Sequence, residues 1–145
     1  MTTIRKAKTE DLEGIMEVIS DVGEEAQKES KEKISKRISE DQLLIYEIDG
    51  KIIGFLGWDA KHQNNPDNWY LEQITIHKDY RGQGIGKELV RYFLDFCRKN
   101  GVKKVYAHVQ DHNERSLKMF LNTGWKINNF SDKKTDKEKT IEFVF

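Results

Sequence analysis

The spacing of hydrophobic and polar residues in the first part of the chain predicts one strand followed by two helices. Residues 3–7 read as a short strand, and Thr9 follows as a helix N-cap with acidic residues in the next turn. Residues 24–41 carry charges of both signs around a sparse apolar pair, which predicts a second, solvated helix. The first helix ends before Gly23, and its apolar stripe consists of Leu12, Ile15, Met16 and Ile19.

The middle of the chain predicts three strands. Two apolar runs, residues 43–48 and 51–58, flank Asp49–Gly50, a dipeptide that favours a two-residue hairpin turn. Residues 61–68 are polar and contain the single proline, so we expect an exposed loop there. A strand pattern resumes over residues 69–77.

The last third of the chain alternates between helix and strand patterns. A glycine-rich turn at residues 82–86 leads into an amphipathic helix that ends near Asn100–Gly101. After it we expect a strand over residues 104–109 and a helix over residues 113–122 that is ended by glycine. A final hairpin is expected from residues 125–130 and 140–145, around a loop rich in lysine and aspartate. The complete order, βααβββαβαββ, predicts an α/β fold in which helices pack on a mixed sheet.

Length and composition limit what this fold can be. A chain of 145 residues suits one domain spanning residues 1–145. The 25 basic and 25 acidic side chains cancel, so no overall field attracts nucleic acid or an anionic membrane. The single cysteine excludes an internal disulfide framework and a cysteine cluster for zinc. No stretch approaches the ~18 apolar residues of a membrane span, and we therefore expect a cytoplasmic protein without a metal.

The segment with the clearest chemistry is Tyr80–Lys87, which lies between a strand and a helix. Its glycines allow positive φ angles and close approach of the backbone to a ligand. The unpaired N–H groups at the start of the helix can hold an anion such as a pyrophosphate. Arg81 and Lys87 add positive charge. The alternative for such a loop, taken by itself, is an ordinary connection between a strand and a helix.

Spacing argues against two other kinds of phosphate-binding loop. A Walker loop has four residues between its first glycine and the Gly-Lys-Ser/Thr end, whereas Gly82 and Gly86 enclose three and Glu88 replaces the hydroxyl residue. The dinucleotide pattern G-x-G-x-x-G fails because the third glycine comes one position early. Neither an NTPase nor a Rossmann domain is favoured.

Arg81, Gly84 and Gly86 resemble the R-x-x-G-x-G/A coenzyme A loop of the GNAT (GCN5-related N-acetyltransferase) superfamily, and residues 71–76 resemble the strand that precedes it. Residues 113–125 resemble the later N-x-x-S/A…F/Y…G-F/W segment of that family. The resemblance covers nearly the whole chain. It implies a single GNAT-like domain with a mixed, mostly antiparallel sheet flanked by helices.

The resemblance also implies an acetyl-CoA-dependent N-acetyltransferase and a set of binding residues. Main-chain groups of Ile74 and Ile76 pair with the pantetheine arm, and the N–H of Ile76 stabilises the oxyanion. Asn113, Ser116 and Phe120 belong to the segment that binds the thiol end. The pyrophosphate is held by the main-chain amides of Arg81, Gly82, Gln83, Gly84, Ile85, Gly86 and Lys87.

In this family the acceptor amine attacks the thioester directly, so the enzyme needs a proton acceptor rather than a covalent nucleophile. An amine with a pKa near ~10 is mostly protonated at neutral pH. Glu72 is the first candidate for the base, and the alternative is a solvated strand residue or the acceptor of a cross-strand hydrogen bond. His108 and Asp111 are weaker substitutes, and His77 is expected to be a loop histidine.

Phe120 departs from the family pattern, because many members have a tyrosine there whose hydroxyl protonates the leaving thiolate. Tyr80 and Tyr106 are candidate replacements, although packing explains either aromatic more simply. The departure motivates an alternative function as a noncatalytic acyl-CoA-binding sensor or interaction module. The sequence does not identify the primary amine that accepts the acetyl group. Because dimers are common in this family, the resemblance also implies a homodimer.

Three further residues have structural interpretations. Trp69 and Tyr70, beside the polar loop at residues 61–68, form either one wall of an acceptor pocket or part of the core. Cys97 lies on the apolar face of its helix, which predicts a small core residue.

Overall fold

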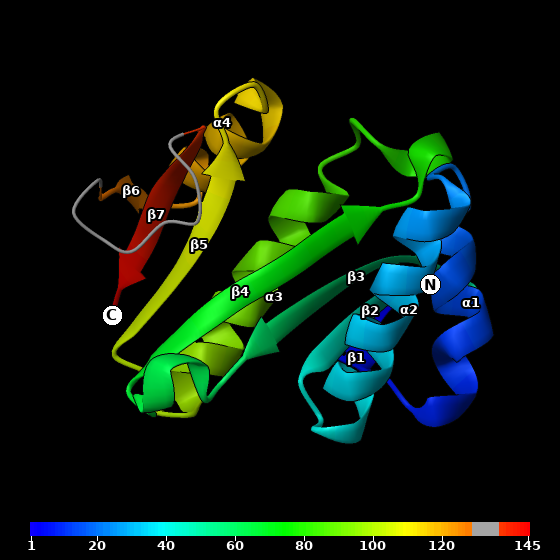
Figure 1. Ribbon diagram of the computed structural model, residues 1–145, viewed down its shortest axis with the longest axis horizontal. Coiled ribbons are helices and arrows are strands. Elements are labelled where there is room, and N and C mark those ends of the chain that lie inside the picture. The colour runs from blue at the N-terminus through cyan, green and yellow to red at the C-terminus, as the bar shows by residue number, and fades with distance from the viewer. Residues whose placement is uncertain (129–136) are drawn as a thin grey trace.

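The computed structural model describes residues 1–128 and 137–145, and its elements follow the order predicted from the sequence (Figure 1). The strands are β1 (Thr2–Lys6), β2 (Leu43–Ile48), β3 (Lys51–Asp59), β4 (Asn68–Ile76), β5 (Lys104–Gln110), β6 (Lys126–Ile127) and β7 (Glu138–Val144). The helices are α1 (Leu12–Val18), α2 (Glu24–Ser39), α3 (Ile85–Lys99) and α4 (Glu114–Asn122). Short 3-10 turns are η1 (Thr9–Asp11), η2 (His62–Asn64) and η3 (Lys78–Tyr80).

The described strands form one sheet in the order β1-β2-β3-β4-β5-β7-β6. Neighbouring strands are antiparallel except for β4 and β5, which are parallel. The α3 helix supplies the crossover that a parallel pair requires. The prediction of a mixed, mostly antiparallel sheet is therefore confirmed.

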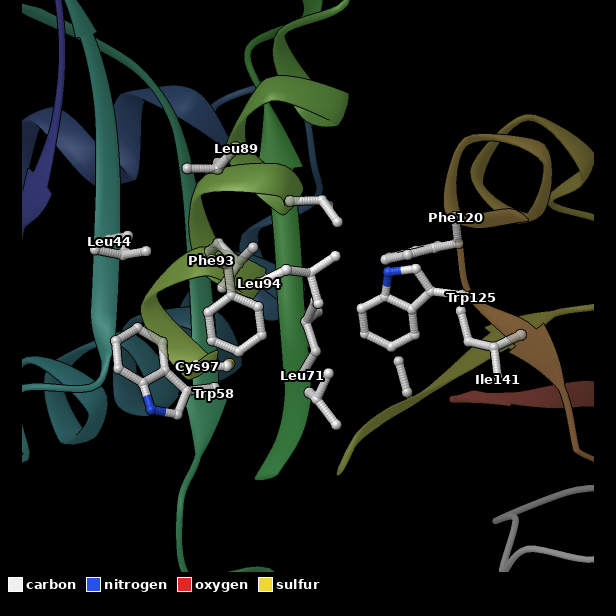
Figure 2. Close-up of a cluster of buried hydrophobic side chains, with 14 of the residues drawn as sticks. Leu44, Trp58, Leu71, Leu89, Phe93, Leu94, Cys97, Phe120, Trp125 and Ile141 are labelled. Carbon is white, nitrogen blue, oxygen red and sulfur yellow. The ribbon is translucent and has the colours of Figure 1, made fainter. Parts of the chain in front are cut away.

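Helices cover both faces of this sheet, and the side chains of alternate strand residues pack against the helices on opposite faces. On β2, Leu43 and Ile45 pack into a core with α1 and α2, whereas Leu44 and Tyr46 pack into a second core with α3 and α4. Figure 2 shows this second core, where Phe93 of α3 lies against the strands. In the described ranges, no helix is long and apolar enough to cross a membrane.

The structure confirms the predicted hairpin turn at Asp49–Gly50, whereas the predicted start of the first helix was wrong. Asp49 and Gly50 have φ angles of 48° and 84°, as a two-residue hairpin turn requires. Thr9, however, opens a 3-10 turn, and α1 begins only at Leu12. The Asp11 carboxylate accepts the Lys8 N–H at 2.7 Å, which closes this turn before the α-helix starts.

The final hairpin is confirmed where the structure describes it. Lys126 and Ile127 of β6 pair with Glu142 and Ile141 of β7. The rest of the predicted strand, residues 129 and 130, and the lysine- and aspartate-rich loop through residue 136 lie outside the described residues.

The parallel strands β4 and β5 separate soon after they meet. Their paired residues run only from Asn68 with Lys104 to Tyr70 with Tyr106. Beyond this point β4 contains an extra residue, Glu72, because Leu71 and Gln73 pair with adjacent residues of β3. A bulge of this kind bends its strand. Figure 1 shows β4 and β5 side by side at their first residues and diverging toward their carboxyl ends.

Cys97 belongs to the core, as predicted, and its chemistry offers a test of the packing. Its side chain is buried on α3, and burial raises the pKa of the thiol to about 12. Because the thiolate is the reactive form, we expect no reaction with a colorimetric disulfide reagent in native buffer and one thiol per chain in guanidinium. Rapid reaction of the native protein would contradict this packing.

Candidate active site

The divergence of β4 and β5 adjoins a cleft of about 680 Å³ on the sheet face that carries α3 and α4. Its walls come from the end of β4, the glycine-rich loop, the first turn of α3 and the exposed side of α4. Most of the predicted cofactor-binding residues line it, namely Ile74, Ile76, Arg81, Gly82, Gly84, Ile85, Gly86, Lys87, Asn113 and Ser116.

The glycine-rich loop has the geometry of an anion-binding site. Gly82 and Gly84 have φ angles of 80° and 82°, and a Cβ at either residue would meet no atom within 4 Å. Gly84 caps α3, and its carbonyl accepts the N–H of Glu88 at 3.1 Å. The amides that precede Glu88 in this turn have no partner within the helix, and they lie at its positive end. Lys87 adds a cation to this wall.

The backbone of β4 presents its polar groups toward the opening. The N–H of His77 donates to the Ile53 carbonyl at 2.8 Å, so the facing pair Gly54 and Ile76 is of the non-hydrogen-bonded type. The main-chain groups of Ile76 therefore point away from β3. The two types of pair alternate, so those of Ile74 point the same way. They face the side from which β5 has departed.

The Arg81 side chain binds the last residue of β4. Its Nε atom donates to the Ile76 carbonyl at 2.9 Å, and its Nη2 atom lies 3.4 Å from the Asp21 carboxylate. The guanidinium thus connects the last residue of β4 with the segment between α1 and α2. The positive charge of Arg81 stays near the cleft while its side chain also holds the strand end in place.

On the opposite face, the bulge residue Glu72 is bound by a buried arginine of α2. The Nε and Nη2 atoms of Arg37 donate to the two Glu72 carboxylate oxygens at 3.0 and 2.9 Å. Arg37 is 6% exposed, and its Nη1 atom also donates to Glu40 at 3.0 Å. The bond to Glu72 raises the pKa of Arg37 further, so the guanidinium remains charged.

A profile of the acetyltransferase (GNAT) family matches residues 9–125. This chain belongs to the GNAT family. The N-alpha-acetyltransferase RimI of Mycobacterium tuberculosis is 31% identical over 77 residues, which are 53% of this chain and 47% of that protein. An uncharacterized N-acetyltransferase of Methanocaldococcus jannaschii is 26% identical over 90 residues, covering 60% of this chain and 40% of the relative. The matched stretch is thus less than half the length of either relative.

Similarity to solved structures extends over the whole GNAT chain. The PaiA N-acetyltransferase of Thermoplasma acidophilum, solved in complex with coenzyme A, has a TM-score of 0.80 at 22% identity. The comparison covers 100% of this chain and 99% of the other. At this level of identity the likeness establishes the fold.

Phe120 and Gln83 are the predicted binding residues that are not among those lining the cleft of this GNAT protein. Phe120 is 2% exposed, and its ring lies 5.0 Å from the ring of Trp125 in the core (Figure 2). Asn113 lines the cleft but also caps α4, since its Oδ1 atom accepts the Ser116 N–H at 3.1 Å. The roles predicted for these residues toward acetyl-CoA stay predictions.

Sequence reasoning missed the cations that α4 contributes to the cleft. Arg115 and Lys118 line it together with Met119 and Asn122. These residues recur at helical spacing, so they share one face of α4. Their spacing was a usable signal, but the family resemblance pointed to Asn113, Ser116 and Phe120 in this segment instead.

The Trp69–Tyr70 pair divides between the two faces of the sheet. Trp69 stacks on Trp58, with ring centroids 5.8 Å apart, in the core beneath α3. Tyr70 faces the other side, 5.1 Å from the ring of Tyr106. Burial, followed by the negative charges of Glu72 and Glu138, raises the pKa of Tyr70 to about 12, so its phenol is neutral.

The Arg37–Glu72 pair should contribute measurably to stability. Glu72→Gln removes the charge that compensates a buried guanidinium, and we expect a loss of about 2 kcal/mol in the free energy of unfolding. Urea denaturation would measure it. Asp95→Asn, which disrupts the exposed pairs of Asp95 with Arg98 and Lys99, is a matched control expected to change stability by less than about 0.5 kcal/mol. Equal losses in both variants would contradict the special role of Glu72.

Proposed function

We propose that this GNAT protein is an acetyl-CoA-dependent N-acetyltransferase that transfers the acetyl group to a primary amine. The observation that carries the proposal is the opening between β4 and β5, where the main chain of Ile74 and Ile76 faces a strand that is no longer paired with it. An extended pantetheine arm carries amides that suit this edge. The adjoining glycine loop suits the pyrophosphate.

The residues of the cleft fit coenzyme A by size and by charge. Gly82 and Gly84 leave open space where other residues would place a Cβ, so a phosphate oxygen can approach the backbone. The cations Lys87, Arg115 and Lys118 lie around the same cleft and would balance the phosphate charges. Acetyl-CoA would supply the activated thioester, and the protein would hold it without a covalent intermediate.

In the proposed reaction the acceptor nitrogen attacks the thioester carbonyl carbon directly. The N–H of Ile76 would donate to the oxygen as it gains negative charge. Glu72, the base predicted from the sequence, lies on the face opposite the cleft, where an acceptor would approach the thioester through the opening. Its two oxygens already accept hydrogen bonds from Arg37.

Calorimetric titration of acetyl-CoA into wild-type protein and a Gly84→Glu variant tests the cofactor site. We expect micromolar binding by the wild type. The glutamate side chain would occupy the open space at the loop and add a negative charge beside the phosphates, so binding by Gly84→Glu should fall by at least about 100-fold, which corresponds to roughly 2.7 kcal/mol.

Gly101→Glu is the matched control, because Gly101 lies at the other end of α3 with a φ angle of 73° and equally open surroundings. Both substitutions place a side chain in the left-handed region and should cost similar stability. Only Gly84→Glu should lose acetyl-CoA binding. Loss of binding in both variants, or no heat with folded wild-type protein, would contradict the proposed cofactor site.

A further inference from the structure

His62, in the loop between β3 and β4, covers the point at which the parallel strands separate. Its ring lies 4.7 Å from the ring of Tyr70 and 5.6 Å from that of Tyr106. These two tyrosines are the last pair joining β4 to β5. The neighbouring residues Leu71 and Val105 pack into the core beneath α3, so alternation of side chains places the His62 group on the opposite face of the sheet.

The position of His62 relates it to the candidate active site. The cleft for the cofactor lies on the α3 and α4 face, whereas His62 lies on the α2 face beside the same separation of strands. A molecule approaching from the α2 face would therefore meet the imidazole next to the opening that leads to the cleft. With coenzyme A in the cleft on the other face, as proposed above, the acceptor amine would approach from this side.

Asp59 lies beside the imidazole in a way that orients it. The Nδ1 atom of His62 is 3.5 Å from the Asp59 carboxylate, which is itself 3.8 Å from the Arg37 guanidinium. A carboxylate near Nδ1 directs the other ring nitrogen, Nε2, away from it. In the described part of the chain, the ring lies beside Asp59 of β3, Tyr70 of β4 and Tyr106 of β5, and Asp59 in turn lies near Arg37 of α2. The negative charges of Glu72 and Glu138 act on Tyr70, and the His108 ring lies 5.5 Å from the Tyr70 ring.

The two residues that follow His62 have an unusual backbone conformation. Gln63 and Asn64, which follow it, both have φ angles of 56°, in the left-handed region that residues other than glycine seldom occupy. Neither is a glycine. The N–H of Asn64 donates to the Lys61 carbonyl at 3.0 Å and closes this turn. Backbone conformations of this kind cluster at active sites and ligand-binding segments.

The other candidate bases near the opening are engaged with protein partners. Each Glu72 oxygen accepts a hydrogen bond from Arg37. The Nδ1 atom of His108 lies 3.1 Å from the hydroxyl of buried Thr140. His62 also has one ring nitrogen beside a protein partner, but that partner is a carboxylate, and the His62 side chain is 30% exposed.

We propose that His62 is the general base of this acetyltransferase and that Asp59 is its positioning residue; the inference rests on the proposed function. The protonated acceptor amine gives one proton to Nε2, directly or through one water. The neutral nitrogen then forms a bond to the carbonyl carbon, and the bond from that carbon to sulfur breaks. Coenzyme A leaves as the thiolate, and the second proton of the nitrogen goes to that sulfur or to solvent.

Steady-state acetyl transfer, followed as thiol release, tests this role in wild type, His62→Gln and Asp59→Asn. The acceptors are 1,4-diaminobutane, a peptide with a free N-terminus, and an N-terminally blocked peptide containing lysine. With the acceptor that the wild type uses, His62→Gln should lower kcat by at least ~100-fold near neutral pH and lose the acidic limb of the pH–rate profile. Its Kd for acetyl-CoA should be unchanged. Asp59→Asn should have an intermediate kcat.

Two controls separate chemistry from folding. Lys61→Gln removes a charge from the same loop and should keep kcat within about twofold of the wild type, as a surface substitution usually does. Imidazole added to His62→Ala should restore part of the rate, which a purely structural role of the side chain would not permit.

An active wild type with equal activity and the same pH profile in His62→Gln would overturn the assignment of His62 and leave the proposed function intact. No transfer by the wild type to any of the three acceptors, despite acetyl-CoA binding, would overturn both. Loss of acetyl-CoA binding in His62→Gln would also contradict a role confined to proton transfer.

Discussion

The site depends on one constraint in the sheet, the early end of pairing between β4 and β5. Only three residues of each strand are paired, and β4 contains the extra residue Glu72 two positions beyond the last paired residue, Tyr70. A regular parallel pair would have used the main-chain groups of Ile74 and Ile76 for sheet hydrogen bonds. Because the strands part, these groups face an opening that lies beside the glycine loop. The Ile76 carbonyl accepts a hydrogen bond from Arg81, and the N–H of Ile76 faces the opening where a ligand would lie.

Arg37 is the side chain that fixes this irregular region from the α2 side. It binds the bulge residue, contacts the carboxylate of Asp59 at the end of β3, and is buried beneath the helix that carries it. The network therefore joins α2, β3 and β4 at the place where the strand bends. Removing one of the carboxylate partners of Arg37 would reduce the compensation of a buried charge, which is costly.

Most of the fold followed from the sequence because its signals are local. The Asp49–Gly50 turn, the stripe on α3 and the loop glycines each report on neighbouring residues, and the mixed, mostly antiparallel sheet came with the family resemblance. The site was harder to predict, since Arg37 and Glu72 are 35 residues apart and the partner of Glu72 came from a helix rather than a strand. The sequence did not single out His62, which lies in a loop of polar residues. Its position beside the site is defined by contacts with Tyr70 and Tyr106, and these contacts exist only in the folded chain.

The short pairing also divides the molecule into two parts. One contains β1 to β4 with α1, α2 and α3, and the other contains β5, β6, β7 and α4; three backbone pairs and the shared core join them. A ligand arm lying between the diverging strands would supply hydrogen bonds that a continuous sheet supplies for itself. Occupancy would then hold the two parts together, and the free energy of binding would appear as added resistance of the whole fold to unfolding.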